Sequence, residues 1–134
     1  MTVHALVVAA GRGTRAGPGG PKQYRPLAGV PVLRRTLDAL IAAGVPAPRV
    51  VIHPEDRAAY AAATRGLALP EPALGGPDRQ ESVRRGLAAL DAPDDARVLI
   101  HDAARPFVSP ALVARVLAAL EAHPGACPAL PVAD

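Results

Sequence analysis

The sequence has almost no aromatic residues and only one cysteine. Its 134 residues include two tyrosines, one phenylalanine and no tryptophan, so alanine, valine and leucine must form the core. The single cysteine, Cys127, excludes an internal disulfide framework and is typical of a protein from a reducing compartment. We therefore expect a cytoplasmic protein with an aliphatic core, in which Cys127 fills space.

The chain also lacks long hydrophobic runs and concentrated charge. No run approaches the roughly 20 apolar residues of a membrane helix, and the first run, Val3 to Ala9, follows no basic leader of a signal peptide. The net charge is only +3, and no aromatic residues interleave with the scattered basic ones, which argues against a nucleic-acid surface. We expect one domain, residues 1–134, that binds neither nucleic acid nor membrane.

Short apolar runs alternate with segments of helical periodicity. The predicted strands are Val3–Ala9, Arg49–His53, a brief one at Ala73–Leu74, Arg97–His101, and a proline-interrupted one at Ala126–Val132. The predicted helices are Val32–Ala43, Glu55–Thr64, Asp78–Leu90 (with Val83, Leu87 and Leu90 inward) and one from Ser109 to about Ala122. This alternation predicts an α/β fold with a Rossmann-like, mainly parallel sheet flanked by helices.

The most distinctive stretch is glycine-rich and follows the first predicted strand. Five glycines and two prolines lie between Gly11 and Lys22, together with Arg12, Arg15 and Lys22 itself. Glycines let backbone N–H groups approach a ligand, and the cations supply charge for phosphate. Lys22 is the only lysine of the chain, and its compact charge differs from the planar fork of arginine. The stretch predicts a loop around a nucleotide triphosphate.

Two familiar phosphate loops do not fit this stretch. A dinucleotide fingerprint could be drawn over residues 11–16, but it needs a helix to begin at once, and the glycine- and proline-rich residues 17–21 cannot be helical. A P-loop needs Gly-Lys followed by serine or threonine, whereas proline precedes Lys22 and glutamine follows it. A long open loop remains, in which Arg15 and Lys22 supply two separated cations.

Two further polar clusters follow predicted strands, where ligands of parallel sheets bind. One is Gly75–Ser82 (GGPDRQES) and the other is His101–Pro106 (HDAARP). Together with Ala9–Arg15 (AAGRGTR) and Pro21–Tyr24 (PKQY), they resemble the motifs of the 2-C-methyl-D-erythritol 4-phosphate cytidylyltransferase family of non-mevalonate isoprenoid biosynthesis. The resemblance implies a fold of the nucleotide-diphospho-sugar transferase type.

The resemblance also implies an activity and a set of site residues. The family transfers CMP from CTP to 2-C-methyl-D-erythritol 4-phosphate, releasing pyrophosphate, with Mg²⁺, and its members form homodimers. Arg15 and Lys22 match its transition-state-stabilising positions, and Asp102 is the implied metal ligand. The residues implied to lie against the nucleotide are Ala9, Ala10, Gly11, Gly13, Gly75, Gly76, Arg79, Ser82, Asp102 and Ala103.

Physical chemistry agrees with this interpretation. An anionic phosphate oxygen attacks an anionic α-phosphate, so repulsion forms a large part of the barrier, and charge stabilisation and positioning lower it. The nucleophile is already deprotonated, so the reaction needs no general base. Mg²⁺ prefers a carboxylate together with phosphates, and Asp102 is the carboxylate of a strand-end motif.

Other interpretations remain beside this one. Ribitol-5-phosphate cytidylyltransferase shares the fold, loop and reaction type, although Ala104 favours the isoprenoid enzyme. The chain could also be a CTP-binding module without catalysis, or a fragment that binds nothing. In the family pattern, the residues that hold the acceptor and the arm that makes the dimer come after the position that corresponds to Asp134. We therefore expect a domain incomplete at its C-terminus, with weak or no activity alone.

Overall fold

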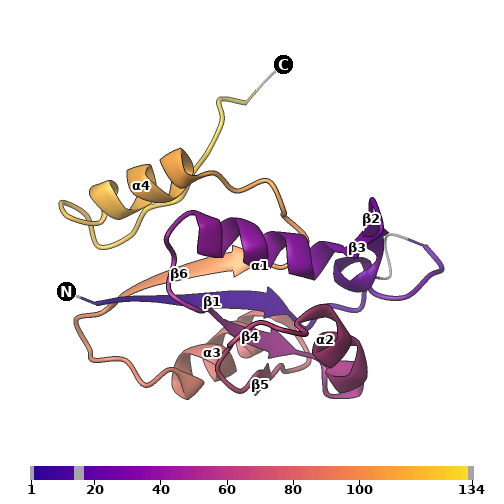
Figure 1. The fold of residues 1–134 in the computed structure, drawn as a ribbon. Coiled ribbons are helices and arrows are strands. Elements are labelled where there is room, and N and C mark those ends of the chain that lie inside the picture. Colours follow the sequence, from indigo (N-terminus) through magenta and orange to yellow (C-terminus); the bar gives the residue numbers. More distant parts are fainter. Residues whose placement is uncertain (1, 14–16, 133–134) are drawn as a thin grey trace.

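The computed structural model describes residues 2–13 and 17–132. A four-stranded parallel sheet in the order β5-β4-β1-β6 forms its centre, with helices on both faces (Figure 1). The elements are β1 (Val3–Ala9), the 3₁₀ helix η2 (Lys22–Tyr24), β2 (Pro26–Leu27), β3 (Val30–Pro31), α1 (Val32–Ala42), β4 (Arg49–Ile52), the 3₁₀ helix η3 (Pro54–Asp56), α2 (Arg57–Ala63), β5 (Ala73–Leu74), α3 (Arg79–Ala89), β6 (Arg97–Asp102) and α4 (Pro110–Ala119). The predicted α/β fold with a mainly parallel sheet is confirmed.

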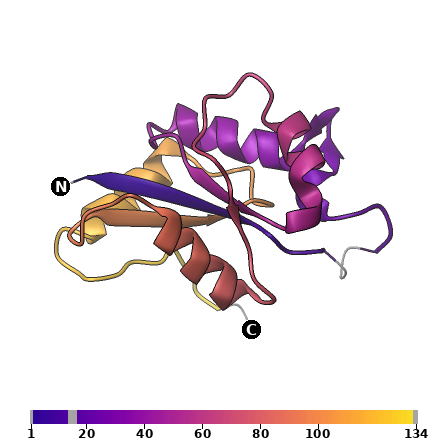
Figure 2. The same ribbon diagram turned by 90° about the horizontal axis from the view of Figure 1, so that it is seen from below.

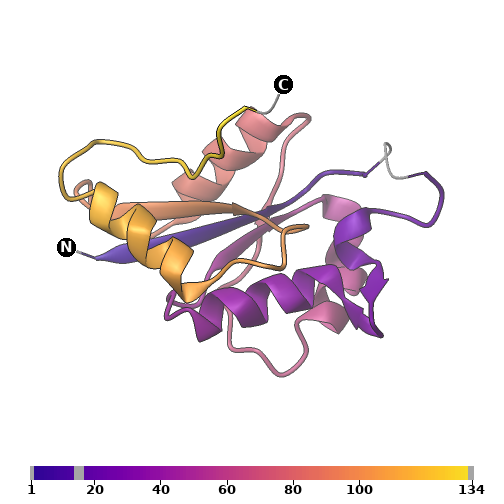
Figure 3. The ribbon, with the colours of Figure 1, turned by 90° about the horizontal axis from the view of Figure 1, so that it is seen from above.

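β1 is central because it is apolar on both faces. Successive strand residues point to opposite sides of a sheet, so Val7 packs in the larger core with α1 and α4, while Leu6 packs on the other face beside α3. Both side chains are fully buried. Figure 2 shows α3 across one face, and Figure 3 shows α1 and α4 across the other. A strand buried on both sides has a continuous apolar sequence.

α1 connects the core to the carboxyl end of β6. Leu33, Leu37 and Leu40 are buried at helical spacing. Thr36 lies among them, fully buried, and its hydroxyl donates a 2.6 Å hydrogen bond to the carbonyl of Ala103. The helix therefore holds the backbone just beyond β6, where one of the sequence motifs lies.

α3 packs on the sheet through small residues. Ser82 and Gly86 are buried, whereas Leu87 is 40% exposed. The prediction that Leu87 faces the core is therefore wrong. A Cβ atom at Gly86 would lie 2.6 Å from Cγ2 of Val51 and 2.7 Å from the methyl groups of Leu6. At Gly86 the helix approaches the sheet so closely that no larger side chain fits there without a shift.

Gly86→Ala is expected to destabilise the fold. The added methyl group would press on Leu6 and Val51, both fully buried. Overpacking of this kind costs about 1–3 kcal/mol, of which the better helix propensity of alanine offsets at most about 1 kcal/mol. Urea unfolding measures the loss. Gly125→Ala is the control, because no atom lies within 4 Å of a Cβ built there. A Gly86→Ala variant as stable as this control would refute the close packing of α3.

The C-terminal part differs most from the sequence-based prediction. Within the described residues β6 is an edge strand, with Ile100 45% exposed, and not a buried strand. Residues 126–132 form no strand and are exposed, because Pro128 and Pro131 lack the N–H groups that a ladder needs. Cys127 is likewise exposed and does not fill the core.

The helices also differ in detail. α4 ends at Ala119, and of its predicted inward residues only Val113 is buried, the others being partly exposed. The predicted helix over 55–64 is divided into η3 and α2. In residues 2–13 and 17–132, no helix combines the length and the apolar character needed to span a bilayer.

Candidate functional site

A cleft of about 830 Å³ opens at the carboxyl ends of β1 and β6. Residues from all three sequence motifs line it, because the carboxyl ends of parallel strands share one edge of the sheet. The predicted site residues in its wall are Ala9, Ala10, Gly11, Gly13, Lys22, Gly76, Arg79, Ser82, Asp102 and Ala103. Gly75 is buried beside Ala10 and Ser82. Arg15, the other predicted catalytic residue, lies outside the described residues.

Lys22 is the first residue of η2 and is exposed at the cleft. Its ammonium group makes no hydrogen bond or ion pair with any residue that the structure describes. Its backbone position is nevertheless well defined, because Gly13 packs against it. Gly13 has a φ of +64°, and a Cβ there would lie 2.9 Å from the backbone nitrogen of Lys22. The ammonium group is therefore available to an anion in the cleft.

Gln23 has a structural role that the sequence analysis missed. Its side chain is 4% exposed, and Nε2 donates hydrogen bonds to the carbonyls of Ala9 at 2.9 Å and Gly11 at 2.8 Å. The only signal in the sequence was the position of a polar residue next to the single lysine. No periodicity indicates that this residue is buried. The amide fixes η2 against the end of β1.

Arg12 was grouped with the phosphate-binding cations, but it is paired with carboxylates. Its Nη1 donates a 2.9 Å hydrogen bond to Oδ2 of Asp56, and its Nη2 lies 3.6 Å from Oε2 of Glu55. The Asp56 side chain is only 8% exposed. This pair ties the start of the glycine-rich loop to η3, across 44 residues of sequence, and the sequence analysis did not find it.

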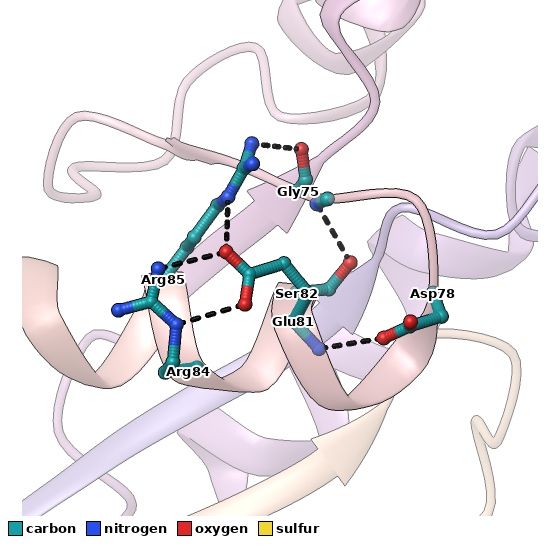
Figure 4. Close-up of polar contacts among 7 residues, drawn as sticks. Gly75, Asp78, Glu81, Ser82, Arg84 and Arg85 are labelled. Atoms are coloured by element: carbon teal, nitrogen blue, oxygen red, sulfur yellow. Dashed lines mark hydrogen bonds and ion pairs between the residues drawn. The ribbon is translucent and has the colours of Figure 1, made fainter.

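The Gly75–Ser82 segment forms a tight turn that leads into the first turn of α3 (Figure 4). The N–H of Gly75 donates to the carbonyl of Ile52 at 2.8 Å, and the N–H of Gly76 donates to Oγ of Ser82 at 3.0 Å. Asp78 caps α3 by accepting a 2.8 Å hydrogen bond from the N–H of Glu81. The segment therefore presents a rigid backbone along the cleft.

A pair of arginines supports this turn from behind (Figure 4). The Glu81 carboxylate accepts hydrogen bonds from Arg84 at 2.7 and 2.8 Å and from Arg85 at 3.0 Å. These bonds, that from Arg84 first, lower the pKa of Glu81 to about 2. Arg85 also donates to the carbonyl of Gly75 at 3.0 Å. Glu81 thus remains charged and holds Arg85 on the turn.

Asp102 ends β6 between two arginines. Its Oδ1 lies 2.6 Å from Nη1 of Arg79, and its Oδ2 accepts a 3.0 Å hydrogen bond from Nε of Arg105. Partial burial alone would raise the pKa of the Asp102 carboxyl, but the Arg105 hydrogen bond and the Arg79 charge together outweigh it. The pKa is therefore below its ordinary value of 3.8. The ion pair of Arg79 with Asp102 joins the Gly75–Ser82 motif to the His101–Pro106 motif.

This depressed pKa predicts a pH-dependent contribution to stability. A carboxyl group whose pKa is lower in the folded state stabilises the fold above its unfolded pKa, and the effect is lost as the pH falls through the folded value. Asp102→Asn should lower the urea midpoint at pH 7 and reduce the further loss on acidification from about pH 5 to about pH 2.5. The exposed Asp94 provides the control variant, Asp94→Asn. Identical acid profiles for the wild-type chain and Asp102→Asn would show that this ion pair does not stabilise the fold.

Comparisons with known proteins place the chain beside one family of enzymes. Residues 3–134 match the sequence model of the family described as IspD: 2-C-methyl-D-erythritol 4-phosphate cytidylyltransferase. The chain is 57% identical over 137 residues to the protein of that name from Cereibacter sphaeroides, with all of this chain and 60% of the relative aligned. It therefore spans about three-fifths of the length of the curated relatives of that name that it matches.

Solved structures resemble the fold. The 4-diphosphocytidyl-2C-methyl-D-erythritol synthase of Anaerococcus prevotii aligns with a TM-score of 0.73 and 27% identity, over 90% of this chain and 52% of that one. Rv0371C of Mycobacterium tuberculosis, solved in complex with manganese, aligns with a TM-score of 0.65 and 26% identity, over 91% and 61% of the two chains.

Proposed function

Because the chain belongs to the 2-C-methyl-D-erythritol 4-phosphate cytidylyltransferase family, we propose that its cleft binds CTP for the transfer of CMP to 2-C-methyl-D-erythritol 4-phosphate. The observation that carries the proposal is the meeting of three sequence motifs around one cleft that exposes Lys22. An ammonium group that no described residue pairs with, beside a backbone-lined wall, suits a triphosphate, whose charge needs both cations and N–H donors.

In the proposed reaction a phosphate oxygen of methylerythritol phosphate attacks the α-phosphorus of CTP. A new P–O bond forms to the acceptor, the bond between the α-phosphorus and its bridging oxygen breaks, and pyrophosphate leaves with that electron pair. Negative charge accumulates at the α-phosphate, so Lys22, with Arg15 as the second cation, stabilises the transition state. No proton has to be removed from the nucleophile.

The rest of the wall is assigned to the nucleotide in this proposal. The backbone from Ala9 to Gly13 lies against the triphosphate, and the rigid turn of Gly75–Ser82 lies beside the cytosine base. Support comes from the hydrogen bonds that hold this turn and from the exposure of Gly11 at the cleft. Asp102 and Ala103 lie beside the ribose and the α-phosphate.

The donor set fits a divalent cation that arrives with the nucleotide. Among the residues the structure describes, no three His, Cys, Asp or Glu side chains come together to hold a metal ion. Mg²⁺ commonly binds one carboxylate together with substrate phosphates and waters, and Asp102 is the carboxylate in the cleft wall nearest to Arg79 and Arg105. When bound, Mg²⁺ would neutralise the charge of the triphosphate. If the phosphates of the nucleotide drew Arg79 and Arg105 away, the Asp102 oxygens would be free to bind Mg²⁺.

A substrate panel tests this proposal. The chain is grafted in place of the matching part of the Cereibacter sphaeroides relative, and pyrophosphate release is measured with CTP, Mg²⁺ and each acceptor. We expect release with 2-C-methyl-D-erythritol 4-phosphate and not with ribitol 5-phosphate. Release with ribitol 5-phosphate alone, or a graft that folds and binds no CTP, would overturn the proposal.

A further inference from the structure

We infer that Gln23 is a positioning residue for Lys22, and that its side-chain amide sets where the lysine ammonium meets the nucleotide phosphates. The inference rests on the proposed function, since it takes Lys22 as a phosphate-binding cation. Neither the family motifs nor the lining of the cleft assigns a role to Gln23 itself.

The two hydrogen bonds of Gln23 join both ends of the glycine-rich loop. The amide has two N–H donors, and both are used on main-chain carbonyls, one at the end of β1 and one at the first glycine of the loop. Gln23 therefore holds η2 beside the main chain at Ala9 and Gly11. Because the side chain is 4% exposed, water competes little for these bonds.

The neighbouring backbone transmits this anchoring to Lys22. η2 is a closed turn, in which the N–H of Tyr24 donates to the carbonyl of Pro21 and that of Arg25 donates to the carbonyl of Lys22, both at 3.1 Å. On its other side, Gly13 approaches the Lys22 nitrogen so closely that no side chain fits. Anchoring Gln23 thus anchors the Cα of Lys22.

Backbone placement matters here because the lysine side chain has no other support. A lysine stem has four rotatable carbons, and no described residue bonds the ammonium of Lys22. A displacement of about 1 Å in a positioning element can cost about 10²-fold in an enzyme rate. The amide of Gln23 therefore controls the position of this charge through the main chain of η2.

A double-mutant cycle on CTP affinity tests the inference with the chain itself. The dissociation constant of CTP with Mg²⁺ is measured by calorimetry for wild type, Gln23→Met, Lys22→Ala and the double variant. Gln23→Met keeps the side-chain length but removes both donors. We expect it to weaken binding about tenfold when Lys22 is present and less than about twofold in the Lys22→Ala background. A role confined to stability would weaken binding equally in both backgrounds.

Controls separate the possible failures. Thr64→Val removes another buried hydrogen bond, 2.8 Å to the carbonyl of Tyr60 in α2, and should act equally in both backgrounds. If Lys22→Ala alone leaves CTP affinity unchanged, the proposed role of Lys22 fails and the inference fails with it. If Lys22→Ala weakens binding but Gln23→Met is additive with it, only the inference fails. Should Gln23→Met not fold, as judged by its thermal melt, Gln23→Asn replaces it in the same cycle, with the same criterion.

Discussion

Lys22→Ala is expected to lower the rate of CMP transfer by on the order of 10²–10³ and to leave the thermal melt unchanged. The loss follows from charge, because the reaction brings an anionic nucleophile to an anionic phosphate and the exposed Lys22 ammonium lies at the cleft. Stability should not change, because the ammonium group that the substitution removes bonds no residue in the described part of the chain. The measurement is pyrophosphate release by the grafted enzyme at saturating CTP and acceptor.

Two variants control for charge and shape. Lys22→Arg keeps the charge but replaces a compact ammonium with a planar guanidinium, and it should recover only part of the rate. Arg115→Ala removes an exposed cation from α4, far from the cleft lining, and should leave the rate unchanged. Wild-type turnover by Lys22→Ala would remove this residue from the mechanism.

Gly11→Val is expected to weaken CTP binding without affecting the fold. Gly11 is exposed, its φ lies outside the left-handed region, and no atom lies within 4 Å of a Cβ built there. The described structure therefore gives no internal reason for glycine at this position. If a nucleotide lies against this backbone, the valine side chain occupies its space. Overpacking costs about 1–3 kcal/mol, which corresponds to an increase in Kd of about 5- to 150-fold.

The contrast with Gly125 makes this experiment specific. Gly125 also has no atom within 4 Å of a built Cβ, but it lies outside the cleft. Gly125→Val should leave CTP affinity and the melt unchanged, whereas Gly11→Val should change affinity alone. Equal CTP affinities of the two variants would mean that the nucleotide does not contact Gly11.

The sequence predicted which motifs come together better than it predicted the packing. A continuous apolar run identified β1, and its parallel neighbours could be expected to end at the same edge of the sheet. The motifs that follow β1, β6 and β5, the last a parallel neighbour of β4, therefore had to lie at that edge, and they line one cleft. This inference needs only topology and no side-chain geometry.

Other features depend on distances that no local pattern encodes. Periodicity predicted that Leu87 faces the core, but it does not tell how near α3 comes to the sheet. Because the helix lies so close, Gly86 faces the sheet and Leu87 is exposed. The pairing of Arg12 with Asp56 joins residues that are 44 positions apart. Gln23 bonds main-chain carbonyls, which carry no residue signature at all. Such contacts become visible only when the loop is folded.

Titration of the chain with CTP in the presence of Mg²⁺, followed by calorimetry, is the most direct test of the central claim that these motifs form a CTP site. The account predicts saturable one-to-one binding, much weaker binding of GTP, and a large loss of CTP affinity in Gly11→Val. A chain that unfolds cooperatively on heating but gives no saturable heat with CTP would contradict it.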